Sequence, residues 1–151
     1  TFDFVLFSFN GLDCISNYDR QFALKEIFRV LKPNGTFMFS SHNRDYKHFD
    51  KLPWQRKIEY SASFLKFCVF ALAYLPRHYK MKRYEVFNSD YALVNDIDHR
   101  FSLLLYYISI DKQREQLATL GFSDIEPYDH NGELVEFDTE SHWIYYLAKK
   151  K

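Results

Sequence analysis

The first 41 residues alternate between apolar and helical patterns in a way that leaves few folds open. Residues 2–7, Phe-Asp-Phe-Val-Leu-Phe, form an almost continuous apolar run, typical of a strand buried on both faces. Residues 36–41 form a second such run. Between them, Ser16 and Asp19 have the spacing of a helix-capping pair, and the Pro-Asn-Gly at 33–35 ends the helical pattern. This order predicts a right-handed βαβ unit, and therefore an α/β fold with parallel strands.

Composition excludes several classes of protein. Aromatic residues make up 20% of the 151 residues, enough for a dense core and too many for a disordered chain. The formal net charge is zero, so we expect no nucleic-acid partner. The charge is uneven, since residues 1–85 carry 14 basic and 8 acidic residues, and residues 86–151 carry 6 and 12. The favoured interpretation of this charge distribution is an uneven solvated surface. The alternatives are attraction between the two halves and an anionic partner that faces the basic half.

The cysteines and the start of the chain carry less information. Cys14 and Cys68 lie far apart and fit no metal-binding spacing, so we expect no metal site and no disulfide framework. Reduced thiols indicate a cytoplasmic protein.

The sequence opens without Met and without a basic leader, directly inside the first apolar run. We therefore expect further residues of the protein before Thr1.

The middle of the chain predicts a helix. Residues 64–75 are apolar almost throughout, too short to span a bilayer comfortably, and Pro76 is expected to stop the helix. Residues 54–75 should be largely helical and pack over the carboxyl-end side of the sheet. Three interpretations stay open: a core helix, a lid over an apolar acceptor, and a contact with a membrane surface, the last being the weakest because a strongly polar face is missing.

The remaining patterns predict two hairpins around a helix. Apolar runs at 90–94 and 101–108 flank a turn and predict two strands. Residues 111–120 have helical spacing and are followed by a glycine. Strands at 122–129 and 143–148 should form an antiparallel hairpin that completes one mixed sheet.

Two of these segments resemble class I S-adenosylmethionine-dependent methyltransferases. Residues 26–35, Glu-Ile-Phe-Arg-Val-Leu-Lys-Pro-Asn-Gly, precede an apolar strand as they do in that family. Residues 116–122 are similar to the start of the family's closing helix and hairpin. The resemblance covers most of residues 1–50 and 101–149. It implies an α/β fold: the C-terminal part of a Rossmann-like methyltransferase sheet, with parallel strands, a closing antiparallel hairpin and a helical insert.

The resemblance also implies a division of the chain and a function. Residues 1–151 would be the C-terminal portion of one methyltransferase domain: a strand-helix-strand unit at 1–41, a lid or substrate insert at 42–100, and a strand, helix and closing hairpin at 101–151. The expected activity is methyl transfer from S-adenosylmethionine to an unidentified acceptor, apolar or small. The family's glycine-rich loop and ribose-binding acid would lie before Thr1, since none of the four glycines forms a G-x-G.

Candidate site residues follow the two parallel strands, because ligands of open α/β sheets bind beyond the carboxyl ends of the strands. The resemblance assigns Ser8, Phe9 and Asn10 to the methionyl end of the cofactor, although turn chemistry alone also explains this cluster. His42 is the candidate general base, since a neutral imidazole accepts protons near pH 7. A structural His42 that bonds a backbone carbonyl is an equal alternative. Asn43, beside it, would face the acceptor.

Two further residues are weaker candidates for substrate binding. His99 lies in the turn between the strands expected at 90–94 and 101–108. It would contact substrate if that hairpin covers the pocket, although a solvated turn is favoured. Tyr107 could line an acceptor pocket, although aromatic stripes are more often core. His130 and His142, in the last hairpin, are expected to do no chemistry.

Two other function classes stay open. One is a non-catalytic Rossmann-like binding or oligomerisation module, and the other is a different nucleotide-using α/β enzyme, because fold does not fix function. The strand at 2–7 should have a free edge and expose Phe2, Phe4 and Leu6, which predicts self-association. We also expect the chain by itself to bind S-adenosylmethionine poorly and to be inactive.

Overall fold

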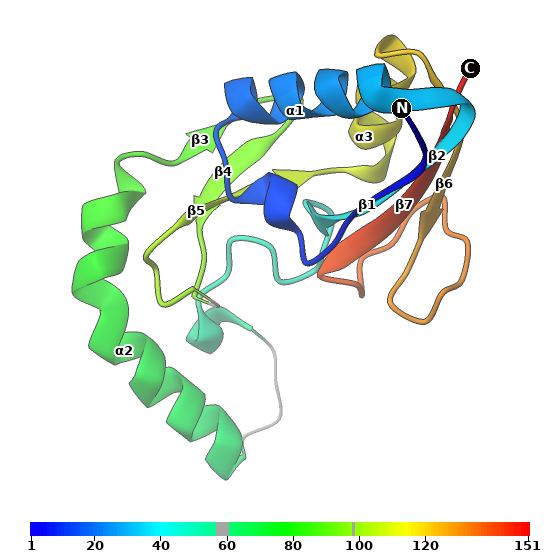
Figure 1. The fold of residues 1–151 in the computed structure, drawn as a ribbon. Helices are drawn as coiled ribbons and strands as arrows, with labels where there is room; N and C mark the ends of the chain where they lie inside the picture. Colours follow the sequence, from blue (N-terminus) through cyan, green and yellow to red (C-terminus); the bar gives the residue numbers. More distant parts are fainter. Residues whose placement is uncertain (57–60, 98) are drawn as a thin grey trace.

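A computed structural model of the chain describes residues 1–56, 61–97 and 99–151. It contains one mixed seven-stranded sheet with the order β3-β4-β5-β2-β7-β6, and β1 pairs with β2 outside this path (Figure 1). The strands are β1 (Phe2–Phe7), β2 (Leu31–Asn43), β3 (Val86–Phe87), β4 (Ala92–Asn95), β5 (Leu104–Ile108), β6 (Phe122–Tyr128) and β7 (Trp143–Lys150). The helices are α1 (Asn17–Val30), α2 (Ala62–Lys82) and α3 (Ile110–Thr119), with short 3-10 helices η1 (Gly11–Asp13) and η2 (Pro53–Gln55).

The βαβ unit expected from the first 41 residues is confirmed. β1 runs parallel to β2, with Val5 opposite Phe37, and α1 connects the two strands. The Ser16 hydroxyl accepts a hydrogen bond of 3.1 Å from the backbone N–H of Asp19, so the predicted capping pair is also confirmed. This cap fixes where α1 begins, and therefore how the chain crosses from one parallel strand to the next.

β2 is longer than the strand predicted at 36–41. It begins directly after α1 and continues to Asn43. The turn expected at 33–35 lies inside this strand, in a stretch where the pairing with β1 shifts register. The extension at the other end places His42 within the sheet, beside Tyr107 of β5.

The C-terminal strands complete the sheet as predicted. β7 lies between β2 and β6 and is antiparallel to both, which confirms the hairpin expected at 122–129 and 143–148. Figure 1 shows α1 and α3 together over the sheet. Apolar side chains of both helices and of the central strands form the main core, whose members include Leu24, Phe37, Phe39, Leu117 and Ile144.

β4 and β5 form the antiparallel hairpin predicted from the runs at 90–94 and 101–108, but their bounds differ from those expected. β4 extends to Asn95, and β5 begins only at Leu104, so the connection between them is longer than the predicted turn. β3 was not predicted and pairs with β4. Its two residues are too few to leave a periodic pattern in the sequence.

The predicted end of the insert helix was wrong. Pro76 was expected to stop it, but α2 continues to Lys82. A proline lacks the N–H that would bond the carbonyl of Leu72, one turn earlier. Leu72 is 54% exposed, so water can reach this side of the helix and satisfy that carbonyl. Of the helical region expected at 54–75, residues 57–60 lie outside the described residues.

α2 contacts η2 and β4 and extends away from the rest of the chain (Figure 1). The described residues contain no helix with the length and apolar character needed to cross a bilayer.

β1 has the free edge that the sequence predicted. Among the described residues it pairs only with β2. Phe2, Phe4 and Leu6 are each more than half exposed. One side of this strand therefore presents unpaired backbone groups next to apolar side chains.

Phe37→Ala tests the main core. Phe37 is fully buried, and its ring stacks on Phe39 with the ring centroids 4.6 Å apart. Removing the ring leaves a cavity, so we expect a loss of about 3–5 kcal/mol in the free energy of unfolding, measured by urea titration. Tyr18→Ala is the matched control, because Tyr18 of α1 is 79% exposed. Equal losses in the two variants would contradict this location of the core.

Candidate active site

A cavity of about 370 Å³ lies where β1 and β2 end. Ser8, Phe9 and Asn10, which follow β1, line it together with His42 of β2 and His99 of the β4–β5 connection. The structure thus brings together five of the residues singled out from the sequence. The first four meet because the parallel strands β1 and β2 end at the same edge of the sheet, and the β4–β5 connection brings His99 to them.

The chain turns sharply after β1 through two left-handed residues. Phe9 and Asn10 have φ values of 57° and 50°. Asparagine tolerates this conformation, but a bulky phenylalanine is an outlier there, and such strain is often found at functional sites. The turn is fixed from both sides, since the Asn10 backbone N–H bonds the Ser40 hydroxyl at 3.0 Å and the Asn10 carbonyl accepts from Asp13 N–H at 2.9 Å.

His42 is held by a buried carboxylate. Asp13 Oδ2 lies 2.8 Å from His42 Nδ1 and also accepts the His42 backbone N–H at 2.7 Å. Asn10 Nδ2 lies 3.3 Å from His42 Nε2. An ionised carboxylate only accepts and an amide NH₂ only donates, so these contacts assign the proton to Nδ1 and the lone pair to Nε2. His42 therefore turns an acceptor nitrogen toward the cavity.

Asp13 was not singled out in the sequence, yet it is completely buried. Its second oxygen, Oδ1, accepts from Ser41 Oγ at 2.8 Å and from Arg20 Nε at 3.4 Å. Together with the two bonds from His42, four donors surround the carboxylate. This arrangement stabilises the ionised form and fixes the orientation of the imidazole.

Arg20, the cationic partner of Asp13, is also completely buried. Its guanidinium donates to Gln116 at 2.6 Å and Gln113 at 2.8 Å, and its carbon lies 4.3 Å from the centre of the Tyr106 ring. Burial raises the pKa of Tyr106, and the Arg20 charge acts in the opposite direction. The pair thus connects η1 and α1 with β5 and α3 below the cavity.

His142 lines the cavity, whereas the sequence analysis expected it to take no part in the chemistry. Its ring lies 5.3 Å from that of His42, between ring centroids. Its Nε2 is 2.9 Å from the Tyr107 hydroxyl, which donates to Asp96 at 2.5 Å. Tyr107 does not line the cavity, but its ring packs against His42 with the centroids 4.9 Å apart. A second layer of polar and aromatic groups therefore supports the candidate base.

Asn43 lies behind the cavity wall and not among the lining residues. Its Nδ2 donates to the carbonyls of Asp138 and Ser141, at 2.6 and 3.1 Å, and its Oδ1 accepts from Asp45 N–H at 3.0 Å. These contacts connect the end of β2 to the loop before β7. The Asn43 amide therefore has a structural role, and its expected position facing the acceptor is wrong.

The lining residues fit one end of S-adenosylmethionine. Asn10 Oδ1 is buried and has no hydrogen-bond partner among the described residues, so it can accept from an ammonium group such as that of the methionyl end. None of the four glycines, Gly11, Gly35, Gly121 and Gly132, lines the cavity. The described residues therefore contain no glycine at the cavity that would let the backbone approach an adenosine group closely.

Comparison with known proteins shows the fold. No family model matches the chain, and no curated protein matches it. A methyltransferase from Thermotoga maritima, described as a possible histamine N-methyltransferase, superimposes with a TM-score of 0.53 and 16% identity over 100% of this chain and 56% of its own. The CcbJ methyltransferase of Streptomyces caelestis gives 0.52 and 13%, over 99% and 61%. The chain has the Rossmann-like fold of class I S-adenosylmethionine-dependent methyltransferases and spans little more than half the length of these structures.

Asp13→Asn tests the buried ion pair. The change leaves the Arg20 charge without its counterion in a fully buried position, so we expect about 3–5 kcal/mol less free energy of unfolding. Asp3→Asn is the control, because the Asp3–Lys32 pair is on the surface and should contribute nothing measurable. Urea titration followed by circular dichroism measures both. Equal stability of the two variants would show that Asp13 does not hold the site together.

Proposed function

We propose that this chain is part of an S-adenosylmethionine-dependent methyltransferase in which His42 is the general base. The observation that carries the proposal is the Asp13–His42 pair at the ends of β1 and β2, in a fold shared with such enzymes. The chain would form the C-terminal portion of one methyltransferase domain. The acceptor would be a small molecule with an apolar part, because Phe9, Trp143 and Tyr145 line the cavity.

Ser8, Phe9 and Asn10 would hold the methionyl end of the cofactor, with Asn10 Oδ1 accepting from its ammonium group. The cofactor supplies an electrophilic methyl group when bound. The strained turn at Phe9 and Asn10 keeps these groups at the strand ends before any ligand arrives, which lowers the entropic cost of binding.

His42 would take the proton from the attacking nitrogen or oxygen of the acceptor. Its Nε2 carries the lone pair on the cavity side, and Asp13 stabilises the positive charge that the ring gains. The 3.3 Å contact from Asn10 Nδ2 is long, so an acceptor N–H or O–H can replace it at little cost. No covalent bond to the protein is needed for this reaction.

His42→Ala tests the proposed base in the intact enzyme. Turnover should fall by about 10²–10⁴, because a positioned base contributes that factor, while cofactor affinity should change little. His130→Ala is the matched control, since His130 bonds Ser141 away from the cavity. Single-turnover methylation and calorimetry with S-adenosylmethionine separate the two quantities. Unchanged turnover in His42→Ala, with an acceptor that must lose a proton, would assign His42 a structural role.

The edge of β1 favours a second function, an oligomerisation module. Its apolar side chains and unpaired backbone can add a strand from another copy of the chain. We expect self-association of the chain in light scattering, reduced by Leu6→Lys. Leu134→Lys is the control, since Leu134 is similarly exposed, at 61%, but lies outside β1. A monomer at all concentrations would contradict this function.

A further inference from the structure

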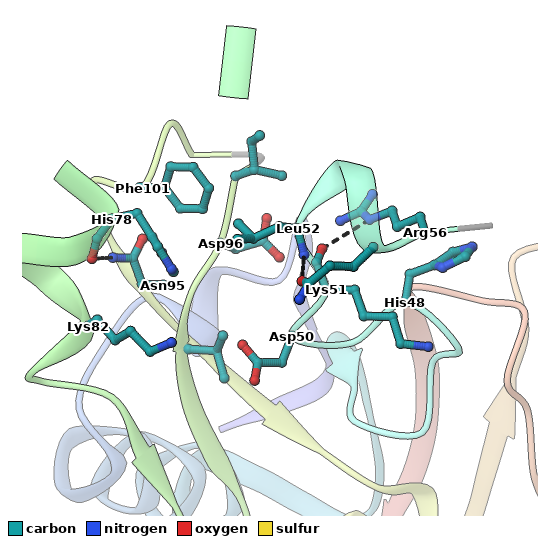
Figure 2. A pocket seen from close by; sticks show the side chains of 13 residues that line it. His48, Asp50, Lys51, Leu52, Arg56, His78, Lys82, Asn95, Asp96 and Phe101 are labelled. Atoms are coloured by element: carbon teal, nitrogen blue, oxygen red, sulfur yellow. Dashed lines mark hydrogen bonds between the residues drawn. The ribbon is translucent and has the colours of Figure 1, made fainter. Parts of the chain in front are cut away.

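A second cavity, of about 180 Å³, lies beside the candidate active site. Asp96 lines it and also accepts from the Tyr107 hydroxyl, so the two regions are neighbours. Its walls come from η2 and the loop before it, the last turns of α2, and the end of β4 (Figure 2). The two cavities have no lining residue in common. The space is equivalent to roughly six water molecules in the liquid, enough for a small polar ligand.

Five charged side chains line this cavity, and two of opposite sign, Asp50 and Lys82, face each other; the others are Lys51, Arg56 and Asp96. Figure 2 shows the Asp50 carboxylate and the Lys82 ammonium pointing toward one another. Among the described residues, neither the Asp50 carboxylate nor the Lys82 ammonium has a hydrogen bond or an ion pair. Burial raises the pKa of Asp50, and Lys82 and His78 act in the opposite direction. The charges therefore interact through space without touching.

The wall opposite Asp50 contains buried polar atoms without partners. Asn95 and His78 are only 2% and 6% exposed. Asn95 Nδ2 donates to the His78 carbonyl at 3.2 Å, which fixes the amide orientation and leaves Asn95 Oδ1 as an acceptor without a donor. His78 Nδ1 also has no partner among the residues that the structure describes, and burial lowers the pKa of His78, so its ring is neutral near pH 7. Leaving such atoms unpaired is costly, and a polar ligand removes that cost.

We propose that this cavity binds a small zwitterion of the amino-acid type, with its carboxylate on Lys82 and its ammonium between Asp50 and Asn95 Oδ1. A simple anion would satisfy Lys82 but be repelled by Asp50, and a simple amine would have the converse problem. A ligand that carries both charges on neighbouring atoms satisfies both groups. The described residues bring no three metal-ligating side chains together, so a metal ion does not explain the arrangement.

Calorimetry on the intact protein tests the proposal, with glycine, L-serine and L-glutamine as zwitterionic probes. Acetate and ethylamine each carry only one of the two charges. At least one amino acid should bind about tenfold or more tightly than either, because each charged hydrogen bond contributes more than a factor of ten.

Asp50→Asn and Lys82→Met should each weaken that binding about tenfold or more. Asp50 has a φ of 52°, a conformation that asparagine accepts, and methionine keeps most of the aliphatic stem of Lys82, so both variants should fold. The matched controls are Asp124→Asn, at another aspartate with positive φ, and Lys80→Met, on the same helix outside this cavity. Both controls should stay within about twofold of the parent protein.

Three results would overturn the proposal. Acetate or inorganic phosphate binding that Asp50→Asn leaves unchanged would show a plain anion site. No binding of any probe at about 10 mM would show that Asp50 and Lys82 pair directly in solution. Equal weakening by the control variants would show a general surface effect. His42→Ala should leave zwitterion binding unchanged, so this proposal and the methyltransferase proposal can fail separately.

Discussion

The buried pair of Arg20 and Asp13 is the interaction on which the rest of the structure depends. Both side chains are fully excluded from water, which costs several kcal/mol per ion before any bond is made. Their hydrogen bonds to Gln113, Gln116 and Ser41 offset that cost and connect two helices to the central strand. A hydrophobic replacement could fill the same space, but it would not fix the direction of a carboxylate.

That direction is what connects the fold to the candidate chemistry. The oxygen of Asp13 that does not contact Arg20 holds the imidazole and the backbone N–H of His42. The candidate base therefore rests on the same residue that neutralises the buried cation. The β4–β5 hairpin is attached differently, since it joins β2 by only two residue pairs. The second cavity touches the support of His42 through Asp96, which accepts from Tyr107.

The elements that could be predicted from sequence are those determined by local patterns. The apolar run of β1, the cap at Ser16 and the closing hairpin each depend on neighbouring residues. The burial of β1 on both faces, which the same run predicted, is wrong, because five of its six residues are exposed. Asp13 and His142 could not be found, because their contacts with His42 join segments that only the folded sheet brings together. The only available signal for Asp13 was an acidic residue two positions after the Asn10-Gly11 turn that follows β1. The continuation of α2 past Pro76 could not be predicted, because it depends on water reaching the carbonyl of Leu72. The sequence pattern does not show which side of a helix faces solvent at that position.

The place of β7 in the sheet also determines the order in which the chain can fold. β2 pairs with β1, its near neighbour in sequence, and with β7, whose residues are about a hundred positions later. During synthesis the βαβ unit can form early, but the other edge of β2, with Phe37 and Phe39, has to wait for almost the entire chain. Closing so long a loop is slow, and an unpaired apolar strand attracts other strands meanwhile. A nascent chain of this protein is therefore most exposed to aggregation between the synthesis of β2 and that of β7.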